Sequence, residues 1–213
     1  MKLFEIFEAS TFTPRDLARD DPGGARTKEY MQKKAEKHAA LIKKDCQPWL
    51  SQTNNGRLVA YRGFGNETPE LAFSKKVRKN RHPLDSDPGT HQLFNQIIAN
   101  TGKVANRSNS VFVTSRKNLA STYSYTGEPH IILPVGNFNY TYSPKVNDWY
   151  HFAESMNEED ILEFFSKPGV ILGDDGTLQK ALKSSTEIML SASRIYAFEP
   201  DYYKKYILPL LQK

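Results

Sequence analysis

Three short segments of this chain hold the residue types that could do chemistry. They are Tyr61-Arg62-Gly63, Phe112-Val113-Thr114-Ser115 and Ser185-Thr186-Glu187. Each adjoins an apolar stretch that favours a strand, so we expect its polar side chains at a strand terminus. Taken singly, each has an ordinary structural explanation: a solvated Arg, a Thr-Ser helix cap and a surface Glu. Whatever chemistry exists must use guanidinium, hydroxyl, phenol and carboxylate groups.

The sequence lacks the fingerprints of several common sites. No G-x-G-x-x-G follows a strand and no G-x-x-x-x-G-K-[ST] occurs, so a Rossmann site and a P-loop have no support. The sequence also has no G-x-S-x-G segment, the pattern that predicts a hydrolase nucleophile. The five histidines show no metal-ligand spacing, and the single cysteine, Cys46, excludes a disulfide framework and a multi-cysteine zinc site. We therefore expect no metal.

In this order, the three segments resemble the ADP-ribosyltransferase family of the Arg-Ser-Glu class. Its pattern is an Arg on the first core strand, an aromatic-x-Ser-Thr-Ser strand leading into a helix, and a Glu opening a later strand. Tyr61-Arg62-Gly63 matches the first element, Phe112-x-Thr114-Ser115 the second with Thr for the first Ser, and Ser185-x-Glu187 the third. The resemblance covers about residues 50–200. It implies an α+β, ADP-ribosyltransferase-like fold with a mixed β-sheet core.

The resemblance also implies a reaction, in which NAD is cleaved at the nicotinamide–ribose bond and ADP-ribose is transferred to an acceptor. Glu187 would stabilise the oxocarbenium-like charge on the ribose, an effect commonly worth about 3–4 kcal/mol. Arg62 would hold the diphosphate, because a guanidinium fork suits phosphate oxygens. Thr114 would orient Glu187. The remaining implied contacts are Gly63, Ser115 and Tyr123 (or Tyr125) for NAD, and Ser185 for the acceptor.

Two departures leave the acceptor and the activity open. Ser185 replaces the acid or amide that often engages the acceptor in the family, so arginine-directed transfer is not implied, and Arg116 replaces the third motif residue. A host protein or a nucleic acid remains possible as acceptor. One alternative is an NAD glycohydrolase, in which water replaces the acceptor. The other is a catalytically inactive virion or nucleic-acid-binding protein of the same fold.

A basic run lies between the first two segments. Lys75-Lys76-Val77-Arg78-Lys79-Asn80-Arg81 holds five cations in seven residues. It is typical of a solvated loop, and it would also suit a platform for a polyanionic acceptor or for the NAD phosphates.

The N-terminus, MKLFEIFEA, resembles the leader of internal head proteins of T-even-like tailed bacteriophages. Ile6-Phe7-Glu8 followed by Ala9 is similar to the site that the phage prohead protease cleaves. This resemblance implies a protein that is packaged in the virion head, injected into the host cytoplasm and active in host takeover. The alternative is an ordinary amphipathic helix that packs Leu3, Ile6 and Phe7 on the domain.

Composition sets the outer limits. The chain has 213 residues, 38% apolar, 12% aromatic and 25% charged, with a net charge of +5. This length fits one domain plus a short appendage, and the mild basic excess permits a polyanionic partner. No stretch approaches 18 consecutive apolar residues, and the N-terminus lacks the apolar region of a secretory signal. We expect a protein that neither spans a membrane nor is secreted through a signal peptide.

The elements that must position the site follow from periodicity and turn residues. We expect a leader and linker over residues 1–26 and one domain over 27–213. An N-terminal helix is predicted over 27–47, with Met31, Ala35, Ala39 and Ile42 on its apolar face. The other predicted elements are strands at 57–64, 110–114, 129–135, 169–172, 187–190 and 194–198, helices at 91–100, 117–124 and 158–165, and a loop over 74–90.

Overall fold

The computed structural model describes residues 25–65, 71–81, 87–124, 128–174 and 176–213, and residues 1–24 of the predicted leader and linker, together with Tyr125, lie outside them. The mixed α and β composition predicted from the sequence is confirmed. The strands are β1 (Ala60–Arg62), β2 (Ala72–Lys76), β3 (Val111–Thr114), β4 (His130–Tyr142) and β5 (Glu187–Phe198). The helices are α2 (Ala25–Asp45), α3 (Gln47–Gln52), α4 (Pro88–Asn100), α5 (Lys117–Thr122), α6 (Trp149–Glu154), α7 (Glu158–Ser166), α8 (Leu178–Ser184), α9 (Pro200–Tyr202), the π-helical turn η2 (Tyr203–Ile207) and α10 (Leu208–Leu211).

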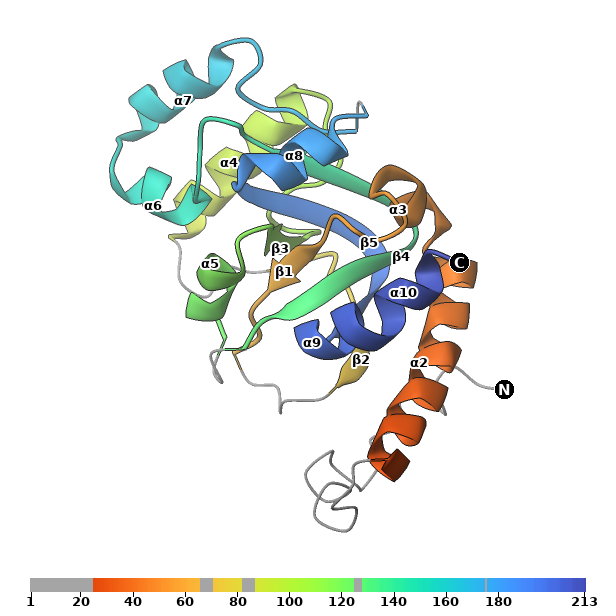
Figure 1. The fold of residues 1–213 in the computed structure, drawn as a ribbon. Coiled ribbons are helices and arrows are strands. Elements are labelled where there is room, and N and C mark those ends of the chain that lie inside the picture. The colour runs from red at the N-terminus through yellow and green to blue at the C-terminus, as the bar shows by residue number, and fades with distance from the viewer. Residues whose placement is uncertain (1–24, 66–70, 82–86, 125–127, 175) are drawn as a thin grey trace.

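The strands form a small barrel (Figure 1). The order is β2-β5-β3-β1-β4, and β4 also pairs with β5, which closes the ring. Every one of these pairings is antiparallel, so the described strands do not form the mixed β-sheet that the resemblance implied. β5 contacts β4 along one side, while its other side pairs first with β3 and then with β2. β5 is thus the strand around which the barrel is organised.

β4 and β5 are long because both bend around the barrel. Their register shifts between Val135 and Phe138, where Gly136 has a φ of +69°, a conformation that glycine adopts without steric cost. The strand predicted over 129–135 therefore continues to Tyr142. The two strands predicted at 187–190 and 194–198 are one strand, β5.

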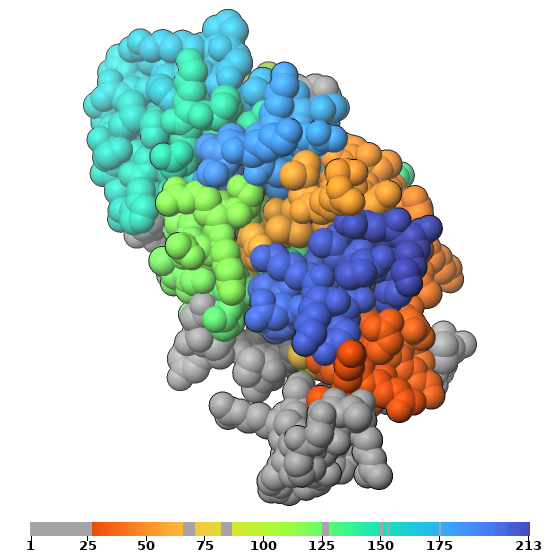
Figure 2. Space-filling model, viewed as in Figure 1, coloured from red at the N-terminus to blue at the C-terminus, as the bar shows by residue number. Residues whose placement is uncertain are grey.

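The larger core cluster lies inside the barrel and under α2. Met31, Ala35, Ala39 and Ile42 form the buried face of α2, as predicted. The helix spans 25–45 instead of 27–47, and Pro48 lies in the first turn of a second helix, α3, as well as ending the first. In Figure 2 the C-terminal segment, coloured blue, lies against the orange residues of the N-terminal helices.

A second, smaller cluster lies at the opposite side of the sheet, where α4, α6 and α7 gather (Figure 1). Trp149 stacks on Phe165 at 5.0 Å between ring centroids, and Phe94 meets both rings edge-on. Met189 of β5 is buried in the same cluster. These aromatic contacts attach α4, α6 and α7 to the part of β5 that directly follows Glu187.

Several predicted elements need correction. The strand predicted over 57–64 is limited to β1, because a turn with positive φ at Asn54, Asn55 and Gly56 delays its start. The loop predicted over 74–90 contains most of β2, whose pairing with β5 overrides its charge, and the first turn of α4. No strand covers 169–172, where only Leu172 makes a bridge, to Tyr142. The helices predicted over 91–100, 117–124 and 158–165 are confirmed as α4, α5 and α7.

Among the described helices, none is long and apolar enough to cross a membrane.

Candidate functional site

The three sequence segments meet at one end of the barrel. Arg62 ends β1, Thr114 ends β3 and Glu187 begins β5. β3 lies between the other two strands, with Tyr61 opposite Thr114 and Thr114 opposite Glu187. Directly opposed residues of antiparallel strands hold their Cβ atoms about 5 Å apart. The structure therefore places Thr114 directly beside Glu187, and Arg62, one residue past the partner of Thr114, is close enough to Glu187 for their charges to interact.

Glu187 is a half-buried residue and the acidic member of this group. Its Oε2 accepts a hydrogen bond from the backbone N–H of Trp149 at 3.3 Å. Burial and the charge of Asp148 raise the pKa of Glu187 to about 7. The Trp149 N–H and the positive charges of Arg107 and Arg62 oppose that rise. Near neutral pH both protonation states of this carboxyl are accessible, a property common at functional sites.

The Arg62 guanidinium lies against β3. Its Nη1 donates to the Phe112 carbonyl at 2.9 Å, and its Cζ lies 5.4 Å from the Phe64 ring centroid. Its Nε is buried and has no hydrogen-bond partner among the described residues. Burial and the nearby charge of Arg81 lower the pKa of Arg62 to about 10, and Glu187 opposes this. Arg62 stays protonated at neutral pH, with a buried donor still to be satisfied.

Thr114 is buried beside Glu187 but does not hold its carboxylate. The Thr114 Oγ1 accepts the backbone N–H of Arg116 at 3.2 Å, which stabilises the turn from β3 into α5. The backbone N–H of Trp149, at the start of α6, fixes the carboxylate instead. The sequence does not reveal this contact, because Trp149 is distant along the chain and donates through its backbone.

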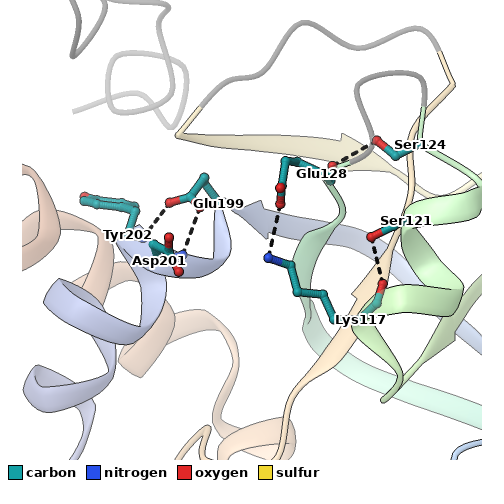
Figure 3. Close-up of polar contacts among 7 residues, drawn as sticks. All are labelled: Lys117, Ser121, Ser124, Glu128, Glu199, Asp201 and Tyr202. Carbon is teal, nitrogen blue, oxygen red and sulfur yellow. Dashed lines mark hydrogen bonds and ion pairs between the residues drawn. The ribbon is translucent and has the colours of Figure 1, made fainter.

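Gly63 and Tyr123 are both positioned by α5. A Cβ on Gly63 would lie 2.4 Å from the Ala120 carbonyl oxygen and 2.5 Å from the Tyr123 carbonyl carbon, so only glycine lets the chain pass this close. The α5 segment is also tied to the start of β4 by the Lys117–Glu128 ion pair at 3.2 Å (Figure 3). The half-exposed Tyr123 donates its O–H to Asp148 Oδ2 at 2.5 Å.

The remaining predicted residues lie at the edges of the site. Ser115 is partly exposed between β3 and α5. Ser185 ends α8 in the left-handed conformation, with φ of +61°, two residues before Glu187. Its backbone turn directs the chain from α8 into β5. The NAD role of Ser115 and the acceptor role of Ser185 stay predictions.

Two charged residues near Glu187, Asp148 and Arg107, were not assigned to the site from the sequence, whereas Arg81, near Arg62, belongs to the predicted basic run. Asp148 and Arg107 both act on the pKa of Glu187, and Arg81 acts on that of Arg62. Arg107 is 8% exposed, and its own pKa is lowered by burial and by Arg81, against the opposing charges of Glu187 and Asp148. Arg107 and Asp148 lie in segments without a motif. Arg81 is the last cation of the basic run, and in the sequence only the intervening Asn80 distinguishes it from the other four.

The chemistry of this group suits an anionic ligand with an electron-poor centre. Three guanidiniums can bind phosphate oxygens, and a carboxylate beside them can stabilise positive charge. In the described part of the chain, no three His, Cys, Asp or Glu side chains are grouped to hold a metal ion.

Comparisons of the chain with protein-family models, with curated proteins and with solved structures give no match.

Proposed function

We propose that this chain is an NAD-dependent mono-ADP-ribosyltransferase, and that its barrel is a form of the ADP-ribosyltransferase fold. The observation that carries the proposal is the meeting of Arg62, Thr114 and Glu187 on three neighbouring strands. They come from segments that are far apart in sequence, in the order typical of the Arg-Ser-Glu class. A carboxylate and a buried arginine at one end of a sheet are the two groups that cleavage of a dinucleotide at its ribose most needs.

The reaction begins with heterolysis of the nicotinamide–ribose bond. The electron pair of that bond goes to the nicotinamide nitrogen, which leaves as a neutral ring, and positive charge develops on the ribose. The ionised Glu187 carboxylate stabilises this charge. The acceptor then forms a bond to the same ribose carbon and loses its proton to solvent or to a base.

Arg62 binds the NAD diphosphate through its guanidinium fork, and its buried Nε is a donor to a phosphate oxygen. The Thr114 hydroxyl holds the turn from β3 into α5, and the backbone of Thr114 pairs with that of Glu187, so Thr114 positions Glu187 through the backbone. Gly63, Ser115 and Tyr123 complete the NAD site in this proposal, while Ser185 faces the acceptor.

The acceptor in this proposal is a host protein or a nucleic acid, reached in the host cytoplasm after delivery in a phage head. The basic run supports a polyanionic acceptor in part. Arg78 and Lys79 are exposed beyond β2, and Lys75 and Lys76 are exposed on it. Arg81 differs, because its guanidinium lies over the Phe112 ring beside the site.

The test is incubation with NAD that carries a label in its adenylate part, first with the protein alone and then with host lysate. We expect labelled macromolecule and free nicotinamide in the second mixture. Free nicotinamide with no labelled macromolecule identifies a glycohydrolase, and neither product identifies an inactive protein of this fold.

Glu187→Gln is the decisive variant, because it keeps the shape of the side chain and removes its charge. We expect NAD turnover to fall on the order of a hundredfold while NAD binding remains. Glu163→Gln, an exposed change on α7, is the matched control and should leave turnover unchanged. Turnover of Glu187→Gln within about threefold of wild type contradicts the assignment.

A further inference from the structure

Two arginines that the motif does not include share one aromatic ring beside Glu187. The Cζ of Arg81 lies 4.7 Å from the Phe112 ring centroid, and the Cζ of Arg107 lies 5.3 Å from it. Arg107 also lies 5.6 Å from the Phe94 ring of α4. A guanidinium over a ring keeps its N–H groups at its edge, where they can meet acceptors.

Arg62 belongs to the same cluster. It donates to the carbonyl of Phe112, the residue whose ring lies under the two other guanidiniums. After burial, the charge of Arg81 is a cause of the lowered pKa of both Arg62 and Arg107. Arg81 is thus close enough to Arg62 and to Arg107 to repel both.

Their arrangement has an electrostatic cost that a bound anion removes. Like charges that are close and partly buried destabilise the folded protein. Glu187 lies near Arg62 and Arg107, and Asp148 lies near Arg107, so the carboxylates offset part of this repulsion. The buried Nε of Arg62, with no hydrogen-bond partner in the described part of the chain, is an additional donor. Arg81 and Phe112 are partly exposed, so a solute can reach the cluster.

We propose that Arg81 and Arg107, with Arg62, form a diphosphate-binding site backed by the Phe112 ring. A diphosphate supplies negative charge that relieves the repulsion and enough oxygens to engage several planar forks. This inference rests on the proposed function for the identity of the nucleotide, because it places the diphosphate of NAD beside Glu187. It assigns specificity for a diphosphate to two residues outside the motif.

The test is calorimetric titration of the full chain with inorganic pyrophosphate, with ADP-ribose and with a single-stranded oligonucleotide. We expect Arg81→Ala to weaken pyrophosphate and ADP-ribose binding by about tenfold or more, the effect of losing a charge-assisted hydrogen bond. Arg81→Lys and Arg107→Lys should recover only part of the affinity, because an ammonium keeps the charge but not the fork. Lys37→Ala, which removes an exposed cation on α2 away from the basic run, is the control and should match wild type.

Thermal melts show which variants fold. Arg107 is almost fully buried, so the binding of Arg107→Ala is compared with that of wild type only if the variant melts cooperatively. Arg81 is more exposed, and its variants keep the test decisive if Arg107→Ala does not fold. Unchanged pyrophosphate affinity in Arg81→Ala overturns the inference. Loss of oligonucleotide binding alone also overturns it, since the site would then serve a nucleic-acid backbone.

The two proposals fail in different ways. If wild type cleaves NAD and Arg81→Ala does so with an unchanged KM, the diphosphate site is wrong and the proposed function stands. If wild type binds pyrophosphate through Arg81 and never releases nicotinamide, the diphosphate site stands and the proposed function is wrong.

Discussion

At the C-terminal end of β5 buried polar groups are joined by direct hydrogen bonds, whereas at its N-terminal end charged groups of like sign face one another. Tyr196 donates its O–H to Asp45 of α2 at 2.6 Å. The hydroxyl of Tyr203 reaches the Gly56 carbonyl at 3.1 Å. At the other end, Asp148 raises the pKa of Glu187 and Arg81 lowers the pKa of Arg62, in both cases as the next cause after burial.

The difference separates a region that stabilises the fold from one that stores electrostatic cost. Hydrogen-bonded polar groups under α2 avoid the penalty of unsatisfied burial and add specificity to the packing. Charges held near others of the same sign around Glu187 lower the stability of the folded chain, and such arrangements cluster at functional sites. We therefore expect changes at the two ends of β5 to separate stability from activity.

The largest effect should come from removing the helices that cover the C-terminal end. A chain that begins at Gln52 lacks the buried faces of α2 and α3, including Trp49, whose ring lies 5.4 Å from that of Phe138. Exposure of this apolar surface should abolish cooperative folding. A chain that begins at Ala25 should fold and keep NAD turnover. Circular dichroism melts decide both, and cooperative unfolding of the shorter chain would falsify the division between the two ends.

The next largest effect should be a gain in the free energy of unfolding when Glu187, at the N-terminal end of β5, is replaced. Because folding raises the pKa of Glu187 from 4.5 to about 7, the protonated form is favoured in the folded state. Wild type therefore loses stability as the pH rises from 4.5 through 7. Glu187→Gln mimics the protonated form and should be about 2 kcal/mol more stable than wild type at pH 8.

Denaturant unfolding at pH 5 and at pH 8 measures that difference. The gain should shrink toward zero at pH 5, where wild-type Glu187 is protonated in the folded state. An equal difference at both pH values, or a less stable variant at pH 8, contradicts the view that Glu187 is held at an electrostatic cost.

A smaller loss is expected from the C-terminal end. Tyr196→Phe removes the O–H that Asp45 accepts and should lower the free energy of unfolding by about 1.5 kcal/mol. Its kcat for NAD cleavage should equal that of wild type. Tyr206→Phe is the control, because the Tyr206 hydroxyl has no hydrogen bond among the described residues. A fall in kcat with no change in stability would place Tyr196 in the site and remove the contrast.

Local pattern predicted the longer elements but missed β2, α6 and α8, and it did not show how the strands join. The apolar spacing of Met31, Ala35, Ala39 and Ile42 predicted α2 and its buried face within two residues. β5 was split in two by the polar Ser191-Ala192-Ser193, because alternation alone does not reveal a strand that bends around a barrel. The C-terminal helices were not predicted, although Glu199-Pro200 is a typical helix start signal. In the structure Glu199 accepts two backbone N–H groups of α9 (Figure 3).

The site could be predicted only where a motif marks it. Arg62 and Glu187 were named from their segments, and the pairing of β3 with β5 brings them together. Asp148 and Arg107 lie in segments with no pattern, and only the barrel places them near Glu187. Their contribution depends on long-range register, which a single sequence does not encode in its local spacing.

The smallest expected effect is a shift in the pH dependence of kcat when a charge near the N-terminal end of β5 is removed. Asp148→Asn removes a negative charge that raises the pKa of Glu187, so that pKa should fall. If the ionised Glu187 supports NAD cleavage, the midpoint of the rise in kcat with pH should move below about 7, by less than about one pH unit. The asparagine keeps an oxygen that can accept the Tyr123 O–H, which limits other changes. Glu159→Gln, at an exposed position of α7, is the control and should leave the midpoint in place. A shift of the midpoint to higher pH in Asp148→Asn would show that the two carboxylates do not repel each other.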